Sequence, residues 1–165
     1  MPAPLATTAV ANAEMLIRKP VDQVFEAFVD PRMTTNFWFT RSSGRLESGK
    51  HVTWDWEMYN LSLDVIVRVI EPHKRIVIEW SSKGSAPTTV EWRFIPRADD
   101  TYVSVTNTGF IGDPYSLVDQ VRNATEGLAL LLAGAKAFLE HNLRLNLIRD
   151  RHPDGLGKRI TAAST

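Results

Sequence analysis

The sequence contains no cysteine, which excludes disulfide bonds, thiolate nucleophiles and cysteine-ligated metal sites. It also has no excess of charge, because nineteen lysine and arginine residues balance nineteen aspartate and glutamate residues. A balanced chain has no electrostatic reason to bind nucleic acid or an anionic membrane surface. The lack of cysteine fits a cytoplasmic protein. We therefore expect a cytoplasmic location, with neither a nucleic-acid partner nor membrane insertion.

Long hydrophobic runs are absent as well. The longest apolar stretch, residues 127–135, is far shorter than the roughly 20 residues that span a bilayer. The first residues lack the basic start and sustained apolar run of a signal peptide. With 44% hydrophobic residues, the chain is long enough to bury a sizeable core. We expect one domain at residues 13–154, with flexible tails at 1–12 and 155–165.

The middle of the chain predicts a meander of antiparallel strands. Apolar and polar residues alternate over residues 51–58, which places Val52, Trp54, Trp56 and Met58 on one face of a strand. The other predicted strands cover residues 13–18, 61–70, 75–80, 88–95 and 101–110. The breaks within the meander are short and turn-like, so consecutive strands must pair antiparallel. This predicts a sheet of about six to seven strands.

Helical periodicity appears on both sides of the meander. Two short helices are predicted between residues 20 and 38, after the first strand. Beyond the meander, Asp113 can cap a helix and Pro114 suits its first position. Apolar residues then recur at steps of three and four, which predicts a long helix from Tyr115 to about Leu143 with one apolar face. Because that face must be buried, we predict an α+β fold in which a curved sheet wraps around the long helix.

Several stretches carry a resemblance to a known family. They are residues 18–28, 69–80 and 101–110, together with Gly127 and residues 136–140. With the order of the elements, they resemble the START-like superfamily, the helix-grip fold of the major birch pollen allergen. The closest branch is named for homology to the activator of heat shock protein 90 ATPase and includes bacterial polyketide-cyclase-like members. The resemblance covers roughly residues 13–154 and implies the fold better than it implies a chemistry.

One position departs from that family pattern. Many members carry Gly-Trp early in the last helix, whereas here Gly127 is followed by Leu128. A smaller residue at this place would enlarge or reshape the cavity that the resemblance implies. Gly134 lies on the same helix face as Gly127, seven residues further on. Both glycines predict either a close approach of helix and sheet or room for a ligand.

Aromatic residues are the main candidates for a ligand site. The candidates are Trp38, Trp54, Trp56, Trp80 and Trp92, four of them on the predicted inner faces of strands. Indole rings that line a cavity can hold an apolar or ring-shaped molecule. The alternative is that they fill an ordinary core, and for a single tryptophan the two interpretations weigh the same. As a set they favour a ligand, because a curved sheet around one helix commonly leaves unfilled space.

Four further residues complete the predicted ligand site. They are Asn107 on the last strand and Leu128, Leu131 and Ala135 on the long helix. The three helical residues share one face through steps of three and four. That face must meet the tryptophan-rich face of the sheet, since a monomer would not leave either one exposed.

Catalytic chemistry finds little support in the sequence. The carboxylates Asp55, Glu57, Glu79 and Glu91 alternate with the tryptophans and are expected on the outer face, although a register slip of one residue would reverse this. The four histidines show no metal-ligand spacing, and neither a nucleophile elbow nor a phosphate-binding loop occurs. We expect no catalytic residue, no metal site and no cofactor. The mixed run 144–153 predicts a helix end, or alternatively a surface for a protein partner.

Three functions remain open on this evidence. The favoured one is a binding module for a small hydrophobic ligand, without chemistry of its own. The resemblance implies two others: an enzyme of the cyclase or aromatase kind, and a co-chaperone-like regulator of an ATPase with a protein partner. For the enzyme, the polar residues to inspect are Asn107, Glu91, Arg93 and His141. Both a monomer and a homodimer are compatible with the sequence.

Overall fold

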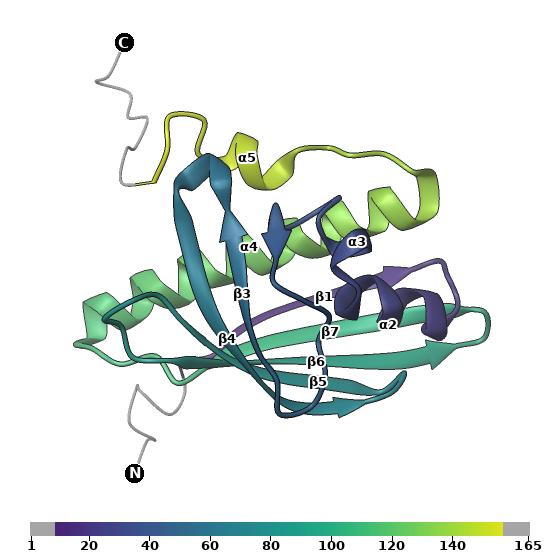
Figure 1. The fold of residues 1–165 in the computed structure, drawn as a ribbon, viewed down its shortest axis with the longest axis horizontal. Coiled ribbons are helices and arrows are strands. Elements are labelled where there is room, and N and C mark those ends of the chain that lie inside the picture. Colours follow the sequence, from purple (N-terminus) through teal and green to yellow (C-terminus); the bar gives the residue numbers. More distant parts are fainter. Residues whose placement is uncertain (1–8, 157–165) are drawn as a thin grey trace.

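A computed structural model describes residues 9–156 of the chain. Seven strands form one sheet in the order β1-β7-β6-β5-β4-β3-β2, and each neighbouring pair is antiparallel (Figure 1). The strands are β1 (Ala11–Ile17), β2 (Arg41–Ser42), β3 (His51–Trp56), β4 (Leu61–Glu71), β5 (Arg75–Ser81), β6 (Thr88–Arg97) and β7 (Asp100–Thr108). The helices are α2 (Val21–Val29), α3 (Pro31–Thr34), α4 (Pro114–His141) and α5 (Leu147–Arg151), with a 3-10 turn η1 (Glu57–Tyr59).

The long helix α4 runs across the curved sheet, and the short helices α2 and α3 pack at one end of it (Figure 1). Leu131, Leu132 and Ala135 of α4 are fully buried against the sheet side of the molecule. Asp113 caps α4 by accepting a hydrogen bond from the Ser116 amide at 2.9 Å. The predicted α+β helix-grip fold, with its two short helices and long C-terminal helix, is therefore confirmed.

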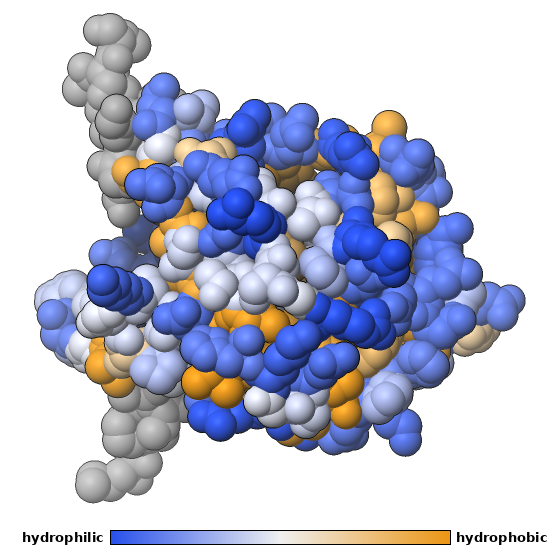
Figure 2. Space-filling view, in the orientation of Figure 1, coloured by the Kyte–Doolittle hydropathy of each residue, from blue (hydrophilic) through white to orange (hydrophobic). Residues whose placement is uncertain are grey.

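The predicted strand faces are confirmed by burial. Val52, Trp54 and Trp56 are buried, while the intervening residues point outward. On the outer face the carboxylates pair with arginines: Asp55 with Arg41, Glu79 with Arg68, and Glu91 with both Arg75 and Arg93. On the face drawn in Figure 2, hydrophilic residues predominate and hydrophobic residues form separate small patches.

Element ends differ from the prediction in several places. The strand predicted over residues 51–58 ends at Trp56, and Met58 lies in the turn η1 instead. Phe37 and Trp38 lie in a turn after α3 rather than on a helix, and the two-residue strand β2 was too short to predict. The helix α4 ends at His141 because Asn142 adopts a left-handed conformation with a φ of 54°. Beyond it the chain turns back and forms α5 instead of extending α4 (Figure 1).

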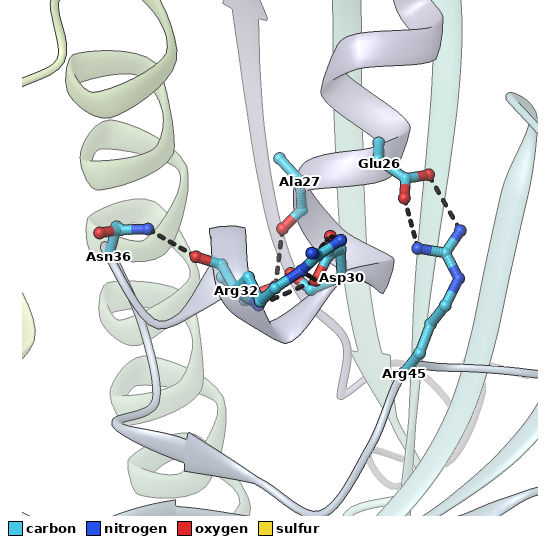
Figure 3. A network of polar contacts seen from close by, with 7 residues as sticks. Glu26, Ala27, Asp30, Arg32, Asn36 and Arg45 are labelled. Atoms are coloured by element: carbon cyan, nitrogen blue, oxygen red, sulfur yellow. Dashed lines mark hydrogen bonds and ion pairs between the residues drawn. The ribbon is translucent and has the colours of Figure 1, made fainter.

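The α2–α3 corner is held by polar contacts, drawn in Figure 3. Asp30 accepts a hydrogen bond from the Arg32 amide at 2.9 Å and pairs with the Arg32 guanidinium, which holds the pKa of Asp30 below its ordinary value. Thr34 Oγ1 donates to the Ala27 carbonyl at 2.6 Å. Glu26 pairs with Arg45, which joins α2 to the loop before β3. These contacts fix the corner from which Phe37 and Trp38 enter the core.

None of the helices within residues 9–156 is long and apolar enough to cross a membrane. The strand β1 begins at Ala11, so residues 11 and 12 belong to the sheet. Residues 1–8 and 157–165 of the predicted tails lie outside the described residues. The division into one domain and two tails stays a prediction.

Candidate functional site

A cavity of about 430 Å³ lies between one end of the sheet, the N-terminal half of α4 and the segment that contains α5. The sheet side is aromatic, with Trp56 at the end of β3, Trp80 at the end of β5 and Phe110 just after β7. Trp38 forms part of the wall from the turn after α3. This volume is within the range of cavities that hold small molecules.

On the helix side, the cavity borders the N-terminal half of α4. Ala124, Gly127 and Leu128 line the cavity. Further along α4, a Cβ on Gly134 would lie 3.3 Å from the carbonyl oxygen of Phe37, so glycine permits a close approach there. The segment after α3 thus packs closely on α4 beyond the cavity, where a smaller pocket of about 140 Å³ remains beside Phe37, Trp38 and Gly134.

The tryptophans form one cluster around Trp38. Its ring centroid lies 5.0 Å from that of Trp54, 5.8 Å from those of Trp56 and Trp80, and 5.9 Å from that of Trp92. Trp54 is stacked on Phe39 with centroids 4.7 Å apart, away from the cavity. Among the described residues, Trp92 Nε1 is the one buried side-chain polar atom without a hydrogen-bond partner. Its ring is edge-on to Trp38.

The structure brings five of the nine residues of the predicted ligand site to the cavity wall. They are Trp38, Trp56, Trp80, Asn107 and Leu128. The other four, Trp54, Trp92, Leu131 and Ala135, are at most 1% exposed and lie in packed core outside the wall. That any of the nine contacts a ligand stays a prediction.

Three polar side chains interact on the inner wall of the cavity. Trp80 Nε1 donates to Thr88 Oγ1 at 2.9 Å, and Asn107 Nδ2 donates to the same oxygen at 3.0 Å. Asn107 Nδ2 also donates to the Thr89 carbonyl at 2.9 Å. These residues come from the end of β5, the start of β6 and the end of β7, which are adjacent in the sheet. Thr88 was not predicted, because a threonine at a strand edge gives no distinctive sequence signal.

The C-terminal segment forms the wall opposite the sheet, beside the tip of the β3–β4 hairpin (Figure 1). Tyr59 in that tip donates its hydroxyl to the Ile148 carbonyl, and burial raises the pKa of Tyr59. Arg151 donates to the Asn123 carbonyl and to Asn123 Oδ1, both at 2.9 Å, and pairs with Glu126 at 3.1 Å. The segment is therefore tied both to the hairpin and to α4.

Glycine at position 127 allows the Arg151 contact. A Cβ there would lie 3.0 Å from Arg151 Nη1, so the guanidinium rests directly over the helix backbone. The sequence run 144–153 predicted a helix end or a partner surface, and the structure shows it as a wall of the cavity through Ile148, Arg151 and His152. Sequence reasoning did not place these residues at the cavity, because their position depends on the turn at Asn142.

Other candidate residues lie away from the cavity. His141 is exposed at the end of α4, and Glu91 and Arg93 pair with each other on the outer face of the sheet. Within residues 9–156, histidines, aspartates and glutamates form no group of three or more that could hold a metal ion.

Comparison with known proteins agrees with this architecture. Residues 18–133 match the family model described as activator of Hsp90 ATPase homolog 1-like protein. The protein SSP2350 from Staphylococcus saprophyticus is 29% identical, with a TM-score of 0.71 over 82% of this chain and 95% of that chain. None of the curated proteins compared with this sequence matches it.

Two more distant solved structures share the fold. DynU16, described as a putative protein in the dynemicin biosynthetic locus, is 21% identical, with a TM-score of 0.74 over 82% of this chain and 49% of that chain. The Aha1 protein from Colwellia psychrerythraea, described as a dimer, is 16% identical, with a TM-score of 0.70 over 80% of this chain and 96% of that chain.

Proposed function

We propose that this chain, which belongs to the activator of Hsp90 ATPase homolog 1-like family, binds a small apolar or aromatic molecule in the cavity between the sheet and α4. The observation that carries the proposal is the unfilled volume of about 430 Å³ behind an aromatic wall. A concave site of this volume with a mainly apolar, aromatic lining is the usual setting for a small-molecule ligand.

The chemistry of the wall supports an apolar occupant. Trp38, Trp56, Trp80 and Phe110 offer ring faces, and Leu128 offers aliphatic surface from the helix. Apolar surface that leaves water on binding stabilises a complex by about 25 cal/mol per Å² before the costs of association. A rigid ring system loses little conformational entropy on binding, which favours an aromatic ligand over a flexible chain.

The enzyme alternative has weaker support. Of the four polar residues that the sequence offered for it, Asn107 lines the cavity, and an amide does not titrate as a general acid or base. The co-chaperone alternative rests on the family name and has no observation in the described residues that favours it.

The proposal is tested with the fluorescent probe 8-anilinonaphthalene-1-sulfonate and the variant Ala124→Phe. Ala124 borders the cavity, so a phenyl ring at this position should occupy part of it and obstruct a bound molecule, and phenylalanine is compatible with a helix. Probe affinity should fall at least about tenfold, which corresponds to about 1.4 kcal/mol.

The matched control is Ala129→Phe, the same substitution on the same helix. Ala129 is exposed and borders a separate, more open depression of about 620 Å³ beside α4, together with Val118 and Val121. Probe affinity should not change in this variant. If Ala129→Phe lowers the affinity for the probe and Ala124→Phe does not, the probe binds outside the cavity and the proposed function is wrong.

A further inference from the structure

We propose that the cavity selects ligands that carry a hydroxyl group, which bonds to Asn107 and Thr88 at the end of the aromatic wall. This inference rests on the proposed function and adds the chemical class of the ligand. It follows from the hydrogen bonds that these two side chains make with the protein and from the bonding capacity that remains.

The orientation of the Asn107 amide is fixed by its neighbours. Its nitrogen lies 2.9 Å from the Thr89 carbonyl oxygen and 3.0 Å from Thr88 Oγ1. A carbonyl oxygen can only accept, so the amide nitrogen must face it, and a flipped amide would set two acceptors against each other. Both N–H groups of Asn107 are therefore used inside the protein.

The amide oxygen of Asn107 is left free to accept. Asn107 is 3% exposed, and no donor within residues 9–156 reaches its Oδ1. This oxygen is not among the fully enclosed orphan atoms of the described residues, and Asn107 lines the cavity. An apolar ligand that covered it would remove its water without replacing the hydrogen bond.

Thr88 supplies the complementary donor. Its oxygen accepts two hydrogen bonds, from Trp80 Nε1 and from Asn107 Nδ2, which occupy both of its lone pairs. The hydroxyl hydrogen is the remaining bonding direction, and Thr88 lines the cavity. The pair thus offers one donor and one acceptor on adjacent side chains.

A ligand hydroxyl matches this pair because it accepts from Thr88 and donates to Asn107 at the same time. An ether or ketone can only accept and leaves Asn107 Oδ1 unpaired, while a carboxylate places negative charge beside that oxygen. Selection by a buried polar group that must be paired is stronger than selection by shape in an apolar cavity.

The test compares three naphthalenes of similar size by titration calorimetry: 2-naphthol, 2-methylnaphthalene and 2-methoxynaphthalene. The naphthol should bind roughly 5- to 150-fold more tightly than the other two, the ratio expected from two neutral hydrogen bonds. In Asn107→Leu and in Thr88→Val this preference should fall by roughly 2- to 12-fold, the contribution of the one hydrogen bond removed, while 2-methylnaphthalene binds as before. Thr88→Ser keeps the hydroxyl and should keep the preference.

Thermal unfolding of each variant without ligand shows whether it is folded. If Asn107→Leu does not fold, Thr88→Val alone tests the preference. Equal affinity of the wild type for naphthol and methylnaphthalene would overturn the inference and leave the proposed function standing. The inference would also be overturned if both variants kept the full preference for the naphthol. It would be overturned as well if none of the three naphthalenes bound while 8-anilinonaphthalene-1-sulfonate did. Failure of all of these molecules to bind would contradict the proposed function itself.

Discussion

The substitutions Trp54→Ala and Trp56→Ala separate a packed tryptophan from one that borders the cavity. Trp54 is 1% exposed, stacks on Phe39 at 4.7 Å and lies outside the cavity wall. Its removal leaves a new void in closed core, which costs about 3–5 kcal/mol. Trp56 is 5% exposed and borders the existing cavity, so its removal should cost less, about 2–3 kcal/mol.

Urea unfolding followed by circular dichroism measures this difference. With an m-value of about 2 kcal/mol/M, the midpoint should fall by about 2 M for Trp54→Ala and by about 1 M for Trp56→Ala. Binding of 8-anilinonaphthalene-1-sulfonate, measured below each midpoint, should change for Trp56→Ala and not for Trp54→Ala. Equal destabilisation of the two variants with unchanged probe binding would show that Trp56 is also packed in closed core, and the cavity would then not exist in solution.

Three further substitutions test other contacts. The Glu140 carboxylate accepts hydrogen bonds from the Arg18 amide and from the Lys136 ammonium group. Burial alone would raise the pKa of Glu140, but these two hydrogen bonds outweigh burial and hold the pKa below its ordinary value of 4.5. The carboxylate therefore stabilises the fold above that pH. Glu140→Gln should cost about 1–3 kcal/mol at pH 7, and urea midpoints should converge as the pH falls below 4.5; a constant difference would refute this. Gly134→Val should lower thermal stability by about 1–3 kcal/mol, because its side chain meets the backbone beside Phe37, and a stabilised variant would contradict that contact. Arg151→Met should speed amide hydrogen exchange in α5 with little change in the global unfolding midpoint; unchanged exchange would show that this side chain does not hold the segment.

The sequence determined the elements and the faces of the sheet. Alternation over residues 51–56 sets which side chains point inward, because successive residues of a strand face opposite sides whatever the rest of the molecule does. Short connections set the antiparallel order of the strands, and the cap at Asp113 sets the start of α4. These are local rules, and they were sufficient to predict the helix-grip fold.

The tertiary structure decided which inward residues border open space. Trp54 and Trp56 share a strand face and a sequence pattern. They differ because Phe39 stacks on Trp54, while Trp56 borders the cavity that α4 and the α5 segment also line. The position of Arg151 depends on the left-handed turn at Asn142, which folds the C-terminal segment back over the cavity. A cavity forms where side chains from segments distant in the sequence do not fill the space between them. A local sequence pattern does not determine this, because it does not specify which distant side chains meet.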